Sequence, residues 1–505
     1  MRNSPRTASI DILDDNSLLH IFYLCRPFLL GEYGDANGRL EGGSDWVRER
    51  WWYKLAHVCQ RWRNVALGSP FYLGLSLVCT RGTPVSDMLA NSPPLPLVID
   101  HFKEGRDISA EDEEATILAL RQRARVRRVR LGVPVTNLLK LIMAIDEEYP
   151  ILEYLVVMRQ VQDNLVLTLP ETFQAPHLRH LVLTGFSLPI GSPLLTAAAG
   201  LVTLCLHMTH PSSYFQPNTL LQWISSMPQL ETLVIAFYFA LPNRDVERQL
   251  THMPVITPIA LPNLHDLNFF GVSTYLEALI HRITTPRLKK LIITFLNQLT
   301  FSVPRLLQFM NTTNNISSER VKLGFFGEQV NVAVYRHGET ETFAVSLNVR
   351  CQHLDWQVSS VAQIVNPPSQ MFSAVEHLTL ERGTHILSSE EHNEVDPIEW
   401  RKLLSSFSGV KTLQIDNGLV EGLSRCLESD DGGLLLVLIP ELQELTYSGS
   451  DNAFTSFVNA RQKAGRPITL HNLYQRSPDL GPFAPSFETS SIAPASSEAG
   501  RYLNT

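Results

Sequence analysis

A short apolar pattern recurs along most of this chain and limits the folds that it can adopt. The pattern is one apolar residue, two variable residues, a second apolar residue, one variable residue and a third apolar residue, as in LRHLVL from Leu178. Other copies start at Val126, Leu152, Leu201, Leu230, Leu264, Leu288, Val375, Val410 and Leu442, and strand-like pieces precede them at 73–79 and 95–100. Except for one longer gap, neighbouring copies start 23 to 35 residues apart, which is typical of leucine-rich repeats.

Helix-like stretches separate the copies, and prolines often end these stretches just before the next strand begins. The stretches lie at 110–124, 136–147, 219–227, 274–283, 303–310 and 397–407. Burying six apolar side chains contributes roughly 10–18 kcal/mol, whereas ordering ~26 residues costs roughly 26–50 kcal/mol of backbone entropy. One copy is therefore unstable alone, and the copies must stack into a curved α/β solenoid with a parallel sheet.

The gap between Leu288 and Val375 contains three alternating, strand-like segments, which predict a hairpin insertion at about 321–350 with a turn near Gly338. A helix is expected to follow at 355–365. We expect the leucine-rich-repeat-like solenoid to span 73–475. Residues 476–505 are rich in Ser, Pro and Ala without any period, and they predict a disordered tail.

The first 72 residues have a different pattern, which predicts helices. Leu18, Ile21, Phe22 and Cys25 share one helical face, and the preceding acidic residues can cap that helix. A glycine-rich segment at about 27–45 predicts an inserted loop. A second helical stretch starts near Trp46, is apolar over much of its circumference, and ends at Gly68-Ser69-Pro70.

Charge and motif content exclude several classes of function. With 42 basic and 50 acidic residues the net charge is −8, which argues against nucleic acid or a membrane surface as the main partner. The six cysteines form no C-x-x-C pair, so we expect no metal site and no cofactor. No phosphate loop, G-x-S-x-G or H-E-x-x-H motif occurs, so we expect a protein that is not an enzyme. Without a signal peptide or a long apolar run, we expect a cytoplasmic and/or nuclear location.

One local exception is a run of arginines between Arg121 and Arg130. The run could grip phosphate or an acidic partner. Alternatively, the arginines lie on the solvent-exposed side of a helix end and a strand. The acidic residues Glu111 to Glu114 could then balance their positive charge.

The N-terminal region resembles an F-box. The residues that carry the resemblance are IDILDDNSLLHIFYLC (10–25), with Ile21-Phe22 ending the first helix, and WWYKLAHVCQRWRNVALGSP (51–70), with a V-C-x-x-W-R-x-x-A-type third helix. The segments LVCTRGTPV (77–85) and DWQVSSVAQI (355–364) resemble the fungal F-box family with a degenerate leucine-rich-repeat-like remainder. The chain departs from the family in having Leu13-Asp14 where Leu-Pro is usual, and in its long first loop.

The resemblance implies an F-box domain at 8–72 and a role as the substrate-recognition subunit of a cullin-based (SCF-type) ubiquitin ligase. The F-box would dock on the Skp adaptor, and through it on a cullin, while the solenoid holds a protein target. The adaptor-binding residues would be Leu13, Leu18, Leu19, Ile21, Phe22, Leu55, Val58 and Trp62. They are more apolar surface than a three-helix unit can hide, and such a surface marks an interface. Alternatively, these residues pack on the first repeats.

Positions beside the second and third apolar residues of each copy should face the concave side of the solenoid. The candidate target-binding residues are His180, His207, Asp266, Asn268, Phe270 and Lys290, a mixed set that predicts no ligand class. Two further functions stay open. The chain could be an F-box and repeat scaffold that acts outside a ubiquitin ligase, or, less in keeping with its motifs, a hydrolase with a non-standard site.

Overall fold

The fold is given by a computed structural model. It describes residues 12–26, 50–102, 108–159, 166–189, 191–239, 258–296, 298–313, 319–336, 342–366, 370–383, 395–428, 438–450 and 452–473. The predicted loop at 27–45, the turn near Gly338 and the predicted tail at 476–505 lie outside these residues.

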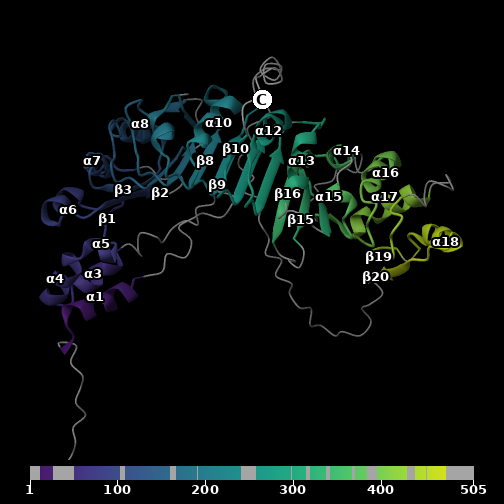
Figure 1. Ribbon diagram of the computed structural model, residues 1–505, viewed down its shortest axis with the longest axis horizontal. Helices are drawn as coiled ribbons and strands as arrows, with labels where there is room; N and C mark the ends of the chain where they lie inside the picture. Colours follow the sequence, from purple (N-terminus) through teal and green to yellow (C-terminus); the bar gives the residue numbers. More distant parts are fainter. Residues whose placement is uncertain are drawn as a thin grey trace, which may run out of the picture.

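One long sheet forms the inner layer of an arch (Figure 1). Its sixteen strands have the order β1-β2-β3-β4-β6-β8-β9-β11-β13-β16-β15-β14-β17-β18-β19-β20, and every pairing is parallel except those of β15. The strands are β1 (Leu77–Cys79), β2 (Leu97–Phe102), β3 (Val126–Gly132), β4 (Tyr154–Met158), β6 (His180–Thr184), β8 (Thr203–Met208), β9 (Thr232–Phe237), β11 (Asp266–Gly271), β13 (Lys290–Phe295), β14 (Arg320–Phe325), β15 (Gln329–Tyr335), β16 (Phe343–Arg350), β17 (His377–Arg382), β18 (Thr412–Ile415), β19 (Glu444–Tyr447) and β20 (Thr469–Asn472). This confirms the predicted α/β class with a largely parallel sheet.

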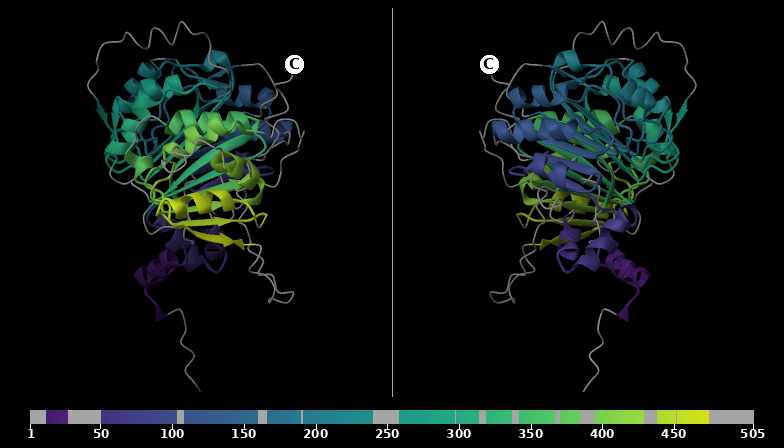
Figure 2. Two further views of the ribbon diagram at one scale, coloured as in Figure 1. Left: turned by 90° about the vertical axis from the view of Figure 1, so that its right-hand side faces the viewer. Right: turned by 90° about the vertical axis from the view of Figure 1, so that its left-hand side faces the viewer.

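In the described part of the chain, helices cover the outer face of the sheet and none lies on its inner face (Figures 1 and 2). They are α6 (Val85–Asn91), α7 (Ala110–Leu120), α8 (Val135–Met143), α9 (Pro193–Ala197), the 3₁₀-helix η2 (Pro211–Ser213), α10 (Pro217–Ser225), α12 (Ser273–Ile280), α13 (Pro304–Thr312), α14 (Leu354–Val365), α15 (Gln370–Ser373), α16 (Pro397–Ser405), α17 (Asn417–Glu428) and α18 (Thr455–Lys463). Two small parallel sheets pair β5 (Leu167–Thr168) with β7 (Phe186–Ser187), and β10 (Ile259–Ala260) with β12 (Ile283–Thr284).

Equivalent residues of successive copies lie directly beside one another in the sheet. Leu181 of β6 is in register with Leu204 of β8, which is in register with Leu233 of β9. All three side chains are fully buried between the sheet and the outer helices. Because each copy covers the apolar residues of its neighbours, the core is continuous from α1 (Asp15–Leu24) to α18.

The three strands in the gap between repeats reverse their order within the sheet. β14 pairs antiparallel with β15, and β15 pairs antiparallel with β16. β16 then pairs in parallel with β13, whereas β14 pairs in parallel with β17. The segment predicted as a hairpin insertion is therefore part of the main sheet, and both of its outer strands continue the direction of the repeats.

The N-terminal helices form a small unit at one end of the arch (Figure 1). The unit consists of α1, α3 (Trp51–Ala56), α4 (Gln60–Gly68) and α5 (Pro70–Leu73). The described part of the helical stretch predicted from near Trp46 consists of two helices, with a break before Cys59. Cys59 has extended backbone angles, and its Sγ accepts the N–H of Trp62 at 3.4 Å, which starts α4 as an N-cap.

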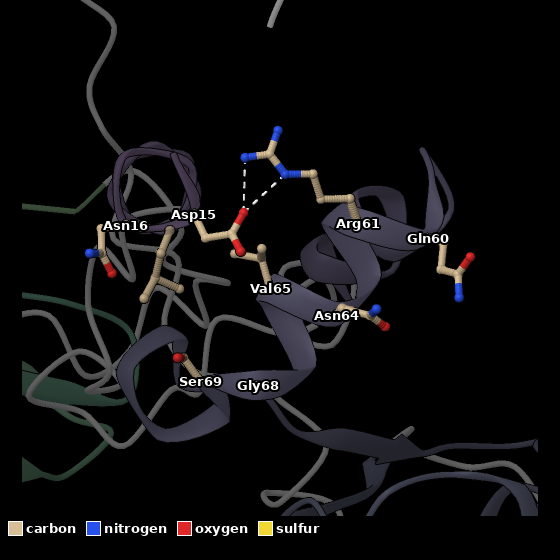
Figure 3. A pocket seen from close by; sticks show the side chains of 9 residues that line it. Asp15, Asn16, Gln60, Arg61, Asn64, Val65, Gly68 and Ser69 are labelled. Atoms are coloured by element: carbon tan, nitrogen blue, oxygen red, sulfur yellow. Dashed lines mark hydrogen bonds and ion pairs between the residues drawn. The ribbon is translucent and has the colours of Figure 1, made fainter. Parts of the chain in front are cut away.

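An ion pair joins α1 to α4 across a shallow polar hollow (Figure 3). A guanidinium nitrogen of Arg61 lies 2.9 Å from a carboxylate oxygen of Asp15, and the same side chain donates to the backbone carbonyl of Leu13. Both charges are partly exposed, so the pair contributes only about 0–1 kcal/mol. Its main effect is to set the position of α1 on α4.

The helical unit is fastened to the first strand of the solenoid by two side chains. The indole N–H of Trp52 donates to the carbonyl of Ser76 at 3.1 Å. Arg50 donates to the carbonyl of Val78 at 3.2 Å and to the hydroxyl of Thr80 at 3.1 Å. Trp52 is also buried in the common core. The helices therefore cover the β1 end of the sheet.

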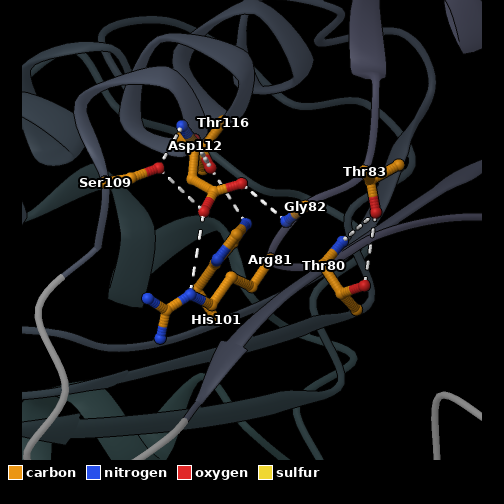
Figure 4. Close-up of polar contacts among 8 residues, drawn as sticks. All are labelled: Thr80, Arg81, Gly82, Thr83, His101, Ser109, Asp112 and Thr116. Carbon is orange, nitrogen blue, oxygen red and sulfur yellow. Dashed lines mark hydrogen bonds and ion pairs between the residues drawn. The ribbon is translucent and has the colours of Figure 1, made fainter.

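A buried carboxylate holds the turn after β1 against the start of α7 (Figure 4). Asp112 accepts the N–H of Gly82 at 2.6 Å and the hydroxyl of Ser109 at 3.0 Å, and Nε of Arg81 lies 4.0 Å away. Gly82 has a positive φ of 72°, which favours glycine at this turn. The carboxylate thus orders both the turn and the first turn of the helix.

Replacing Asp112 with alanine is expected to lower the free energy of unfolding by about 1–3 kcal/mol, because the N–H of Gly82 and the hydroxyl of Ser109 lose a charged acceptor. Glu111 is the matched control, since it is exposed and sits in the same first turn. Replacing Glu111 with alanine should lower the free energy of unfolding by only about 0.3–1 kcal/mol, because it removes a negative charge near the helix N-terminus. Urea unfolding of the two variants measures the difference, and equal losses would contradict the role given to Asp112.

Candidate interaction surfaces

The predicted adaptor-binding residues divide into three groups by exposure. Leu18 and Phe22 are 0% exposed, and the ring of Phe22 packs 4.9 Å from that of Trp62. Leu13, Leu19, Leu55 and Trp62 are partly buried against the core. Among the eight, Ile21 and Val58 are exposed. The prediction that Leu18 and Phe22 lie on a binding surface is thus wrong for this conformation, because they hold α1 on α4.

Exposed apolar side chains nevertheless gather on the outward side of α1 and on α5. Leu24 is 69% exposed and Phe71 is 88% exposed. Tyr23 of α1 contacts Tyr72 of α5, with ring centroids 5.0 Å apart, so the two helices share one surface. We define the α1–α5 patch as Ile21, Tyr23, Leu24, Phe71 and Tyr72, all of which are exposed.

The sequence pattern missed most of this patch for a simple reason. The spacing of Leu18, Ile21 and Phe22 predicts one apolar face, of which Leu18 and Phe22 pack inward while Ile21, at its edge, is exposed. Leu24 and Phe71 lie off this face, and α5 was not predicted as a helix. Pro70 suits the first position of a helix, so the sequence Pro70-Phe71-Tyr72-Leu73 could have indicated α5.

The hollow between α1 and α4 offers no binding chemistry of its own. Besides Asp15 and Arg61, its lining includes Asn16, Gln60 and Asn64. The one carboxylate and the one guanidinium there pair with each other (Figure 3). No net charge is left for an ionic ligand, so the α1–α5 patch is the stronger candidate on this unit.

On the inner face of the arch, the predicted target-binding residues differ in accessibility. His180 is 8% exposed, and its Nδ1 lies 3.1 Å from the hydroxyl of Thr203. Burial, with Arg179 and Arg128 nearby, lowers the pKa of His180 to about 4. His180 is therefore a neutral, packed side chain, which corrects its prediction as an accessible contact.

The other five predicted residues keep partial exposure. They are His207, Asp266, Asn268, Phe270 and Lys290. Burial lowers the pKa of His207 to about 4. Burial raises the pKa of Asp266, while the neighbouring Lys290 acts in the opposite direction. At neutral pH, His207 thus adds no charge to the inner face.

The inner face also changes character along the arch. Between β2 and β9 it carries a second apolar cluster on the side away from the helices, formed by Tyr154, Val156, Val182, Cys205 and Val234. From β11 onward the inner face becomes more polar, although Phe270 of β11 and Ile292 of β13 are apolar. Asn331, for example, donates to the hydroxyl of Ser346 at 2.8 Å and to Asn348 at 2.7 Å.

A ladder of rings follows the ends of the strands where these two regions meet. His207 stacks on Tyr238 with centroids 6.0 Å apart, and Tyr238 contacts Phe270 at 4.7 Å. The guanidinium of Arg350 lies 5.1 Å from the centre of the Phe270 ring. The repeat pattern did not predict Tyr238 or Arg350, because Tyr238 comes after its strand and Arg350 belongs to the reversed strands.

The arginine run is engaged within the chain. Arg123 pairs with Asp146 and Glu147, and Arg127 pairs with Glu153 at 2.9 Å. Arg125 donates to the carbonyl of Leu95 at 3.1 Å, and Arg130 lies 3.2 Å from Asp100. The compensation thus comes from neighbouring repeats and not from Glu111 to Glu114.

Comparisons with known proteins add little to this geometry. No protein-family model matches the chain, and no curated protein matches it. Among solved structures, the TLR13–ssRNA13 complex matches at 13% identity and a TM-score of 0.31, covering 78% of this chain and 49% of that chain. The leucine-rich repeat-containing protein LegL7 from Legionella pneumophila matches at 11% identity and a TM-score of 0.24, covering 78% and 99%. The chain thus spans about half the length of the first match.

At such low similarity, the fold assignment depends on the strand order and register of this chain. These describe a leucine-rich-repeat-like solenoid, a fold whose long inner surface suits protein binding. None of the helices in the described part of the chain combines the length and the apolar composition that a membrane span requires.

Proposed function

We propose that this chain is the target-binding subunit of a cullin-based ubiquitin ligase. In this proposal the N-terminal helical unit docks on the Skp adaptor, and the inner face of the arch holds a protein target inside the cell. The observation that carries the proposal is the α1–α5 patch, together with the resemblance of its helices to an F-box. The patch lies on a small unit at the end of the arch, away from the long surface that would hold a target (Figure 1).

The energetics of the patch favour a partner. Burying a side chain such as Leu24 or Phe71 contributes about 1.5–3 kcal/mol each relative to leaving it in water. In the described structure these two side chains make little use of that energy, since both are more than two-thirds exposed. Adjacent exposed aromatic and aliphatic side chains are the usual composition of the centre of a protein interface.

A scaffold that acts outside a ubiquitin ligase is the second candidate, and one observation favours it. The helical unit covers the β1 end of the sheet, with Trp52 and Arg50 bonded to the segment from Ser76 to Thr80. Solenoids need such terminal caps to stay soluble. The N-terminal helices could thus serve only to cap the solenoid, while the inner face binds partner proteins.

Binding of the purified full chain to a Skp adaptor distinguishes the two candidates. Changing Ile21 and Leu24 together to aspartate is expected to weaken binding by at least tenfold, because the interface would bury two charges. Ile398 is the control, since it is an exposed apolar residue on a helix at the opposite end of the arch. Ile398→Asp should bind like the unchanged chain.

Both variants should keep the circular dichroism of the parent chain, because Leu24 and Ile398 are more than half exposed and Ile21 more than a third. The affinity of each chain for the immobilised Skp adaptor can then be compared directly by surface plasmon resonance. Equal affinity of the double variant and the Ile398→Asp control, or no binding by the parent chain, would refute the ligase role and leave the scaffold.

A further inference from the structure

A mixed row of rings and one cation crosses the middle of the inner face at the ends of the strands. Tyr238 contacts Phe270 of β11, and Phe270 contacts Arg350 of β16. Gln329 of β15 is in register with Arg350, and the N–H of Phe326 donates to the carbonyl of Gln329 at 2.9 Å. We define the inner-face row as Tyr238, Phe270, Arg350, Gln329 and Phe326.

Glycines shape the far end of this row. A Cβ atom on Gly324 would lie 2.7 Å from the ring of Phe326, and one on Gly383 would lie 2.6 Å from it. The ring thus rests against the backbone of β14 and the end of β17 at places where only glycine leaves room. Phe326 is still 39% exposed, so one face of the ring stays accessible.

The charge of the row comes from Arg350. This side chain is exposed, and among the described residues it forms no ion pair; its contact is the face of the Phe270 ring. A guanidinium on an aromatic face keeps its hydrogen-bond donors available for a planar anion. Exposed Tyr, Phe and Arg side chains in one place are typical of binding hot spots.

The dimensions of the row fit a short extended peptide. From β9 to β14 there are five steps between neighbouring strands in the sheet order. At about 4.8 Å per step the row is roughly 24 Å long, the span of about seven residues of extended chain. Such a peptide would cross the strands and place alternate side chains on the face of the sheet.

We propose that the inner-face row binds an extended acidic segment of a target protein, with one Asp or Glu carboxylate on Arg350 and apolar side chains on the rings of Tyr238, Phe270 and Phe326. This inference rests on the proposed role of the arch as a target-holding surface and specifies what the surface recognises. A single guanidinium matches a single carboxylate, whereas phosphorylated motifs are generally bound by clusters of arginines.

The test uses random peptides displayed on phage and selected against the immobilised full chain. Enriched peptides should carry Asp or Glu within three to five positions of an aromatic or large aliphatic residue. Fluorescence polarisation with a labelled enriched peptide should show at least tenfold weaker binding to the Arg350→Ala variant. Changing the acidic residue of the peptide to Asn or Gln should weaken binding to the parent chain by a similar factor. Combining this peptide with the Arg350→Ala variant should weaken binding little further, because both changes remove the same contact.

Arg121→Ala is the matched control, because Arg121 is an exposed arginine at the end of α7 on the outer side. It should bind the peptide within twofold of the parent chain. Failure to enrich any peptide over background, or equal affinity for the Arg350→Ala and parent chains, would overturn the proposal. At least tenfold tighter binding of the same peptide with phosphoserine in place of the acidic residue would also overturn it.

The same assay separates this inference from the proposed ligase role. The variant with Ile21 and Leu24 changed to aspartate should bind the peptide like the parent chain, because the α1–α5 patch lies on the helical unit. The Arg350→Ala variant should bind the Skp adaptor unchanged. A parent chain that binds the adaptor but enriches no peptide refutes the inner-face row alone. A parent chain that binds a peptide through Arg350 but does not bind the adaptor refutes the ligase role alone.

Discussion

Replacing Phe237 with alanine is expected to lower the free energy of unfolding by about 3–5 kcal/mol, the usual cost of removing a buried phenylalanine side chain. Phe237 is 0% exposed at the end of β9. Its ring lies 4.8 Å from that of Tyr275, 5.5 Å from that of Phe215 and 6.5 Å from that of Phe269. One side chain thus links three successive copies of the repeat.

Because Phe237 lies in the middle of the repeat array, its loss should affect unfolding beyond the repeat that contains it. Repeat proteins are stabilised by contacts between neighbouring copies, so a weak link in the middle separates the two sides. We expect hydrogen exchange to accelerate in β9 and β11 first, with urea unfolding that is no longer a single transition. Phe71→Ala is the control, since that ring is exposed, and its unfolding curve should match the parent. A single transition with an unchanged midpoint for Phe237→Ala would contradict the role of this ring.

Replacing Arg461 with alanine is expected to cost about 3 kcal/mol, because buried carbonyl groups that accept from a charged donor lose their partner. Arg461 is 1% exposed in α18. Its guanidinium donates to the carbonyls of Ile439, Pro440 and Leu442 at 3.1–3.2 Å. These carbonyls belong to the turn that leads into β19, which includes Ile439 with a positive φ of 49°.

The expected loss is confined to the C-terminal end of the arch. Hydrogen exchange should accelerate in β19 and β20, while β6 to β9 keep the rates of the parent chain. Lys463→Ala is the control, since Lys463 is exposed on the same helix and has the same charge. If both variants exchange alike, Arg461 is not the residue that holds this turn.

The repeating strands could be predicted from the sequence because one physical requirement sets their pattern. Each copy must place its apolar residues at the same offsets to meet those of its neighbours, as at Leu181, Leu204 and Leu233. The strand from Val126 and the helix from Ala110 therefore lie close to their predicted ranges. The reversed order of β14 to β16 was beyond such reasoning, because alternation shows that a segment is a strand and not which strand it pairs with.

The candidate sites were harder to predict for a related reason. Apolar spacing marks the face of a helix that is buried, and it does not say whether the chain itself or a partner buries it. Leu18 and Phe22 were thus assigned to a partner although their own helical unit covers them. Arg350 and Tyr238 come together only through the pairing of β16 with β13, which no local pattern contains.

The reversal of β14 to β16 also bears on how the chain forms during synthesis. Each earlier strand can add to the sheet as soon as it leaves the ribosome, but the neighbour of β13 is β16, the last of the three to be made. The edge of β13 must wait, uncovered, for several seconds at about 5–20 residues per second. During this interval β14 could pair with the exposed edge of β13 in place of β16, and a chaperone bound to the nascent chain would prevent that mispairing.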